Sequence, residues 1–198
     1  MNQTATKTPK TSENPHTAFP FATGSQPGYR PDEVDAFLAR ARSTYEGREE
    51  PGAGGITAAE VRRTAFRVKR KGYAARYVDA AMDRLEEVFF ERERRAKIRA
   101  EGEDAWWAET RQLLSEVRGR LQRPRGKRFR VRGLLATGYR RSQVDAFLDR
   151  ISEMFESREM MKPAEVRDVV FHTQLRGYDE EQVDALLDAV VDLILATR

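Results

Sequence analysis

The chain has 198 residues, of which 39% are hydrophobic and 34% are charged, and its 36 basic and 32 acidic side chains give a formal net charge of +4. Because the charges nearly balance, the composition excludes a general polyanion binder, and any electrostatic function must come from local clusters. The chain contains no cysteine, which excludes disulfides, thiolate catalysis and cysteine-ligated metals.

Residues 1–18 are rich in Thr, Pro, Asn and Ser. They lack the apolar stretch of a signal peptide, so we predict a disordered tail. No apolar run in the chain approaches the roughly 20 residues that a membrane-spanning helix needs. Together with the absence of cysteine, these features favour a cytoplasmic protein without a spanning anchor.

A Gly-Tyr pair followed at fixed spacing by Val-Asp occurs four times. The copies are Gly28, Tyr29, Val34 and Asp35; Gly72, Tyr73, Val78 and Asp79; Gly138, Tyr139, Val144 and Asp145; and Gly177, Tyr178, Val183 and Asp184. The second and fourth copies align without a gap at an offset of 105 (Gly72 to Gly177), and the first and third align at an offset of 110 (Gly28 to Gly138). The order is therefore A-B-A-B, as if a two-repeat unit had been duplicated. We predict a first repeat pair over residues 19–95, a helical connector and basic linker over 96–126, and a second repeat pair over 127–198.

Each Gly-Tyr pair predicts a turn followed by the start of a helix. Glycine tolerates positive φ, so we expect it in the turn, with Tyr at N′ just outside the helix. Tyr at N′ and Val at N4 have the spacing of a hydrophobic staple. Pro31 suits the first helical position of the first copy, and Asp179 with Gln182 forms a capping-box variant in the fourth.

Apolar residues recur at helical spacing after each start, and in the fourth copy they are Val183, Leu186, Leu187, Val190, Val191 and Ile194. In the B repeats another helix precedes the glycine, capped by Thr57 in one and opening at Pro163 in the other. We therefore predict an all-α fold in which the B repeats are helix-turn-helix hairpins. In the A repeats, residues 19–26 and 129–137 replace the first helix, and extended and irregular conformations both stay open for them.

Residues 118–132 form a basic strip without an acidic residue. Its candidate anion-contacting side chains are Arg123, Arg125, Lys127, Arg128, Arg130 and Arg132. Three interpretations stay open: a linker docked on an acidic face of the chain, a contact with anionic lipid, and a contact with nucleic acid. The last helix offers such a face, because Asp179, Glu180, Glu181, Asp184, Asp188 and Asp192 lie on it without a cation among them.

The repeated aspartates invite a catalytic or metal-binding interpretation. We interpret them instead as acidic residues near helix N-termini, where the helix dipole favours negative charge. No repeat adds a second carboxylate or histidine at ligand spacing, and neither His16 nor His172 has a nucleophile near it in the sequence. We therefore predict that the protein is not an enzyme and that it uses no metal, cofactor or small-molecule substrate.

The B repeats resemble the N-terminal domain of DivIVA proteins. The shared pattern is a short Thr-led segment, an aromatic residue, a basic-Gly-Tyr turn and Val-Asp at the start of a helix; it runs here over residues 57–79, and over 162–184 with Lys162 in place of the threonine. With four copies, the chain is most similar to actinobacterial DivIVA-domain repeat proteins. The resemblance implies a cytoplasmic scaffold of cell division or polar growth that self-associates and contacts the inner face of the membrane, at the septum or pole.

The chain departs from DivIVA in two respects. The apolar positions of residues 84–122 are too irregular for the sustained heptads of a long coiled coil. The membrane contact of DivIVA is an exposed hydrophobe followed by Arg just before Gly-Tyr, and Leu175-Arg176 alone fits that pattern.

These observations favour a non-catalytic scaffold that acts through self-association and docking of other proteins, with weak contact to an anionic membrane. The alternative is a helical nucleic-acid-binding protein that uses the basic strip.

Overall fold

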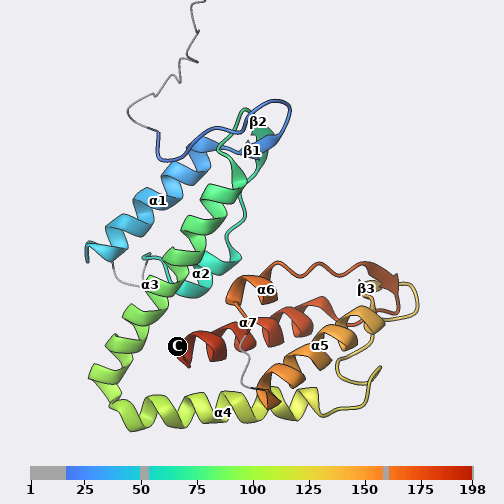
Figure 1. Cartoon of the computed structure of the whole chain (residues 1–198). Helices are drawn as coiled ribbons and strands as arrows, with labels where there is room; N and C mark the ends of the chain where they lie inside the picture. The colour runs from blue at the N-terminus through green and yellow to red at the C-terminus, as the bar shows by residue number, and fades with distance from the viewer. Residues whose placement is uncertain (1–16, 50–53, 158–160, 198) are drawn as a thin grey trace, which may run out of the picture.

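The computed structural model describes residues 17–49, 54–157 and 161–197. They are mostly helical, with two small two-stranded sheets (Figure 1). The elements in chain order are β1 (Pro27–Tyr29), α1 (Pro31–Tyr45), α2 (Ala58–Arg63), β2 (Val68–Arg70), α3 (Ala75–Glu101), α4 (Glu103–Leu121), β3 (Thr137–Tyr139), α5 (Arg141–Glu156), α6 (Pro163–Arg167), β4 (Thr173–Leu175) and α7 (Glu180–Ala196). Most of the predicted tail, residues 1–16 with His16, lies outside the described residues.

The helix starts lie where the motif predicts them. The N-caps of α1, α3, α5 and α7 are Arg30, Ala74, Arg140 and Asp179, so that each motif Tyr occupies N′ and each motif Val occupies N4. The Asp179 side chain accepts a hydrogen bond from the backbone N–H of Gln182, as predicted. All four valines are buried.

The prediction of helix-turn-helix hairpins is wrong in detail, because a strand replaces the turn. β1 pairs antiparallel with β2, placing Gly28 opposite Lys69, and β3 pairs in the same way with β4. The segments left open in the A repeats, residues 19–26 and 129–137, therefore lead into strands. Each strand has three residues, too few to show the alternation by which a strand is recognised in a sequence.

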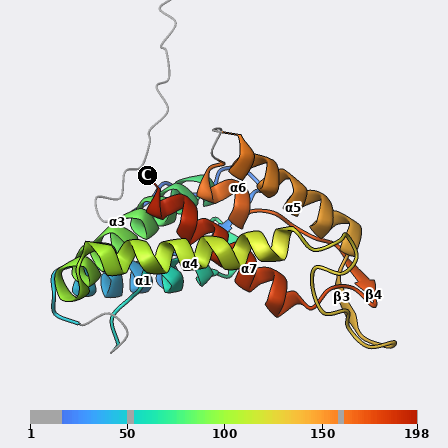
Figure 2. The same ribbon diagram turned by 90° about the horizontal axis from the view of Figure 1, so that it is seen from below.

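The helices form two arms that are joined where α3 turns into α4 (Figures 1 and 2). Gly102 makes this turn with a φ of 92°, a conformation that side-chain-bearing residues rarely adopt. The first arm holds α1, α2 and most of α3. The second arm holds α5, α6 and α7, and α4 packs along it with Val117 and Leu121 in the core.

Candidate functional site

The glycines of the motif meet in pairs across each small sheet. A Cβ atom on Gly72 would collide with the backbone of Gly28 and Tyr29, and one on Gly177 would collide with the backbone of Gly138. The sequence predicts glycine at these positions because it tolerates positive φ, but none of the four motif glycines has a positive φ, so this reason is wrong. The positive φ angles belong to the preceding residues Lys71 (55°) and Arg176 (53°), while the glycines are needed for the close approach of two backbones.

The tyrosine of each repeat reaches the aspartate of its partner repeat. The Tyr73 hydroxyl lies 3.1 Å from a carboxylate oxygen of Asp35, and the Tyr178 hydroxyl lies 3.0 Å from one of Asp145. The same contact forms in the opposite direction within each pair: the Tyr29 hydroxyl donates a hydrogen bond to Asp79, and the Tyr139 hydroxyl donates one to Asp184. The helix-dipole interpretation of these aspartates missed this role, in which they join the two repeats of a pair.

The surroundings of these side chains shift their pKa values. Burial, with the hydrogen bond to Asp145, raises the pKa of the Tyr178 hydroxyl to about 12. Burial also raises the pKa of the Asp79 and Asp184 carboxyls, and the hydrogen bonds from Tyr29 and Tyr139 oppose this shift. Perturbed carboxyls can mark active sites, and here each one is exposed and hydrogen-bonded to a neighbouring phenol.

The arginines of the basic strip mostly pair with aspartates of the same chain, although only Arg128 among them is buried. Its arginines pair with three aspartates: Arg125 and Arg128 with Asp149, Arg128 also with Asp145, and Arg130 and Arg132 with Asp179. Arg123 instead exchanges hydrogen bonds with the backbone and side chain of Arg128. Lys127 is exposed and has no ion pair among the described residues.

We expected the strip to dock on the acidic residues of the last helix. Of these, Asp179 binds arginines of the strip, while Asp188 and Asp192 bind Arg62 of α2. Asp145 and Asp149 were not expected as partners, because only the fold brings α5 beside the strip.

Three leucines project from the end of the second sheet. Leu134 and Leu135 are 73% and 95% exposed, and Leu175 is 64% exposed. The backbone N–H of Arg176 donates to the carbonyl of Ala136 (3.0 Å), which holds the two segments together. We call Leu134, Leu135, Leu175 and Arg176 the leucine tip. It contains the predicted pair Leu175-Arg176 and adds two leucines that the motif before Gly-Tyr does not include.

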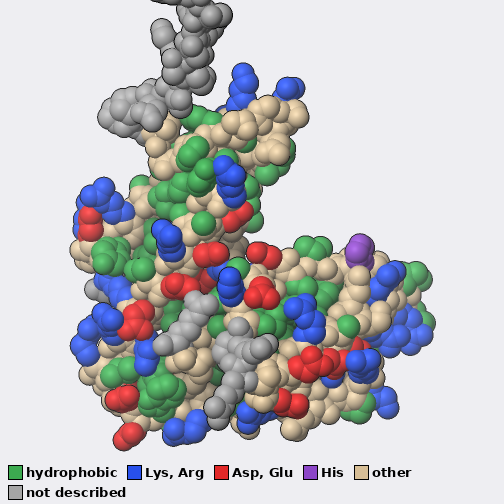
Figure 3. All heavy atoms as spheres, viewed as in Figure 1, with side chains coloured by type: hydrophobic (Ala, Val, Ile, Leu, Met, Phe, Trp, Pro, Cys, Tyr) green, Lys and Arg blue, Asp and Glu red, His purple; other side chains and the backbone are tan. Residues whose placement is uncertain are grey.

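The first sheet has the same backbone layout and different chemistry at its end. Gly24 and Ser25 occupy the turn equivalent to Leu134 and Leu135, and Arg70 and Lys71 occupy the positions of Leu175 and Arg176. Figure 3 shows hydrophobic and basic side chains together at the end of the second arm. The two ends of the molecule thus differ in apolar surface while sharing one geometry.

No known protein family, curated protein or solved structure matches this chain.

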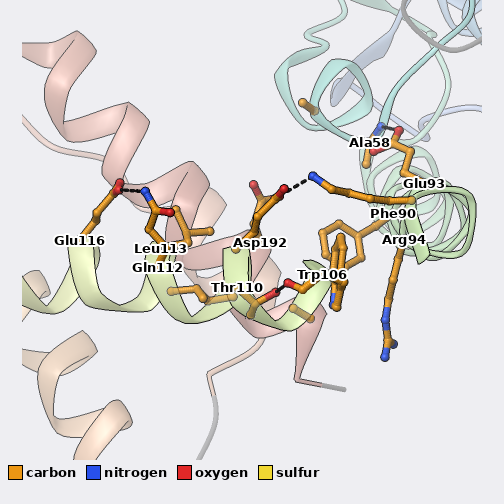
Figure 4. Close-up of a pocket in the computed structure, with 15 residues that line it drawn as sticks. Ala58, Phe90, Glu93, Arg94, Trp106, Thr110, Gln112, Leu113, Glu116 and Asp192 are labelled. Carbon is orange, nitrogen blue, oxygen red and sulfur yellow. Dashed lines mark hydrogen bonds and ion pairs between the residues drawn. The ribbon is translucent and has the colours of Figure 1, made fainter. Parts of the chain in front are cut away.

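A hollow of about 680 Å³ lies between α3, α4 and α7 (Figure 4). Some of its polar groups bind one another: Glu93 accepts from the backbone N–H of Ala58 (2.7 Å), and Lys97 pairs with Glu109. Two others, Arg94 Nε and Trp106 Nε1, are buried without a hydrogen-bond partner among the described residues. Phe90 and Trp106 pack edge to face within it, with ring centroids 6.0 Å apart. Trp106 therefore gives the hollow both an aromatic wall and an N–H group that has no acceptor among the described residues.

Within the described residues, no group of three or more His, Asp and Glu side chains is placed to hold a metal ion. His172 is exposed, and its Nδ1 lies 3.0 Å from the side-chain nitrogen of Gln143. No helix in the described part of the chain is long and apolar enough to cross a membrane.

Proposed function

We propose that this protein is a non-catalytic scaffold that holds to an anionic membrane surface through the leucine tip and docks other proteins on its helical faces. The observation that carries the proposal is the tip itself. Three exposed leucines beside an exposed arginine that has no ion pair among the described residues form an apolar wedge with a cation at its edge. Exposed apolar clusters with a charged rim are typical of interaction sites.

The energies favour reversible binding. Burying one leucine is worth about 1.5–3 kcal/mol, and a cation close to an anionic surface adds about 1 kcal/mol. Three leucines give several kcal/mol before the cost of immobilising the protein is subtracted. This is about three times what Leu175 alone would give. Several tips in one self-associated assembly would raise the affinity further through effective concentration.

The resemblance to DivIVA agrees with this proposal. A duplicated A-B repeat unit and a tip with a hydrophobe followed by Arg before Gly-Tyr both fit a scaffold at the cytoplasmic face of the membrane. We accordingly propose a role in cell division or polar growth, at the septum or pole. Fluorescent localisation in the native cell tests this part.

Co-sedimentation with liposomes tests the membrane contact. We expect binding to anionic vesicles and none to neutral ones, with weaker binding at high salt. The triple change Leu134→Ser, Leu135→Ser and Leu175→Ser should lower the partition at least about tenfold, because burial of the tip is its main source. Val68→Ser removes an exposed hydrophobe from β2 of the first sheet and is the matched control. Equal binding by the triple variant and the control would show that the leucine tip is not the membrane contact.

The nucleic-acid alternative has less support, because Arg125, Arg128, Arg130 and Arg132 are already in ion pairs with aspartates of the same chain. A phosphate would have to compete with these aspartates for each arginine. A DNA-binding isotherm at two salt concentrations distinguishes the two functions. Tight, steeply salt-dependent binding would favour the alternative.

A further inference from the structure

Helix α4 covers one face of the second pair. Its buried residues Val117 and Leu121 lie in the same core as Leu148 of α5 and Leu193 of α7. Figure 2 shows α4 lying along α7. In the first pair, α1 and α3 take the places of α5 and α7, and no helix of the described chain takes the place of α4.

The burial of equivalent residues shows which face is left open. Leu148 is fully buried, while its equivalent Leu38 is half-buried. Phe155 is half-buried, while its equivalent Tyr45 is 61% exposed. Leu193 of α7 is 3% exposed, while its equivalent Val88 of α3 is 44% exposed. The first pair therefore lacks the cover that the second pair has.

The uncovered residues follow the helical period. They are Leu38, Arg42 and Tyr45 of α1 and Tyr77, Ala81, Arg84, Val88 and Arg92 of α3, which we call the α1–α3 face. Their spacing of three or four residues places them on one side of each helix. A hollow of about 610 Å³ lies at one end of the face, lined by Tyr45, Val88 and Arg92 among others.

The charge of this face differs from that of the covered one. Arg84 stands where the second pair has Ala189, and Arg42 stands where it has Ser152. Neither Arg84 nor Arg99, which lines the hollow, has an ion pair in the described part of the chain. An occupant of the face must therefore bring apolar side chains for Tyr45 and Val88 and carboxylates for the free guanidinium groups.

We propose that the α1–α3 face docks one amphipathic helix of a partner protein, whose apolar stripe is like that of α4 and whose flanks are acidic. A second copy of the chain is a poor occupant, because the same face of that copy would bring Arg84 and Arg42, and so more positive charge, in place of the carboxylates that Arg84 lacks. The inference rests on the docking part of the proposed function and gives the partner its chemistry.

Two synthetic peptides serve as probes in fluorescence anisotropy with the full chain. Both carry the α4 sequence with Leu113, Leu114, Val117 and Leu121 kept. In the acidic peptide Arg111, Arg118 and Arg120 are replaced by Glu, and in the basic peptide Glu109 and Glu116 are replaced by Lys. We expect the acidic peptide to bind at least about tenfold more tightly than the basic one, with the difference shrinking at high salt.

Variants of the chain locate the binding. Val88→Asp should weaken the acidic peptide about tenfold or more, and Arg84→Ala should weaken it severalfold and reduce its salt dependence. Val170→Asp, at an exposed apolar position outside the face, is the matched control and should bind as the parent does. Circular dichroism verifies that each variant keeps its helix content.

Three results would overturn the inference: no binding of the acidic peptide, equal binding by Val88→Asp, or a concentration-dependent dimer in sedimentation velocity that Val88→Asp abolishes. The last would assign the face to a second copy. Liposome binding by Val88→Asp separates this inference from the membrane proposal, because the leucine tip is unchanged in that variant. Loss of peptide binding with membrane binding intact shows that the two surfaces act independently.

Discussion

Arg62 and Arg167 donate to the two carboxylate oxygens of a single buried side chain, Glu86. The two arginines are 105 positions apart and so occupy equivalent places on α2 and α6. Arg62 also binds Asp188 of α7, and Arg167 binds Asp83 of α3, two aspartates that are again 105 positions apart. The contact between the two arms is therefore reciprocal, as in a two-fold symmetric dimer, with Glu86 between the two arginines.

Removing the shared carboxylate should weaken this contact strongly. In Glu86→Gln the buried guanidinium of Arg62 keeps Asp188 and Asp192 as partners but loses the charge of Glu86, so we expect a cost of about 1.5–3 kcal/mol, that of a hydrogen bond to a charged group. Urea denaturation measures the loss of unfolding free energy. Glu153→Gln, on the exposed side of α5, is the control and should change it by less than about 0.5 kcal/mol. A loss below about 1 kcal/mol for Glu86→Gln would contradict the role of the cluster.

The paired glycines predict opposite effects of one substitution at two sites. Gly177→Ala places a methyl group against the backbone of Gly138, so the sheet must open, and we expect a loss of more than about 2 kcal/mol. Gly119→Ala lies within α4 with open space around the new methyl group, and alanine is favoured over glycine in a helix by about 0.5–1 kcal/mol. Thermal unfolding of both variants measures the two shifts. Destabilisation of equal size at both sites would show that close approach is not the reason for Gly177.

Tyr178 should make stability fall at alkaline pH. Its pKa is about 12 in the folded chain and near 10 in an exposed tyrosine, so its contribution is complete below pH 10. Between pH 10 and 12 the unfolded chain loses the phenolic proton first, and the contribution disappears. Tyr178→Phe should cost about 1–2 kcal/mol at neutral pH through the lost bond to Asp145.

Denaturation of the parent and of Tyr178→Phe at pH 8, 10 and 11 tests this expectation. The gap in unfolding free energy between the two should narrow as the pH rises. A constant gap would mean that the Tyr178 proton is not linked to folding.

Local rules made the helices predictable. Tyr29 and Val34 are five residues apart, and their spacing fixes the start of α1 without reference to the rest of the chain. The bond between Tyr73 and Asp35 was not predictable in this way, because it depends on the pairing of β1 with β2 across about 40 residues. The same limit applies to Arg128, whose partners Asp145 and Asp149 come from a later helix.

The leucine tip was predictable from the sequence only in part. Leu134 and Leu135 are adjacent leucines between Gly133 and Ala136, outside any helical period, and that pattern in a turn is a sign of exposed apolar residues. Their position beside Leu175 became clear only with the strand register, which sets Thr137 opposite Leu175. The sequence therefore contained the chemistry of the tip but not its assembly.

Helix α3 belongs to both arms at once. Val78 near its start packs in the core of the first pair, while Phe90, three turns further on, packs against the core of the second. Helical hydrogen bonds form and break cooperatively. Unfolding of one arm would therefore also break turns of α3 that pack in the other arm. The middle of α3 should accordingly hold the slowest-exchanging amides of the molecule, and the two arms should open as one foldon and not as two.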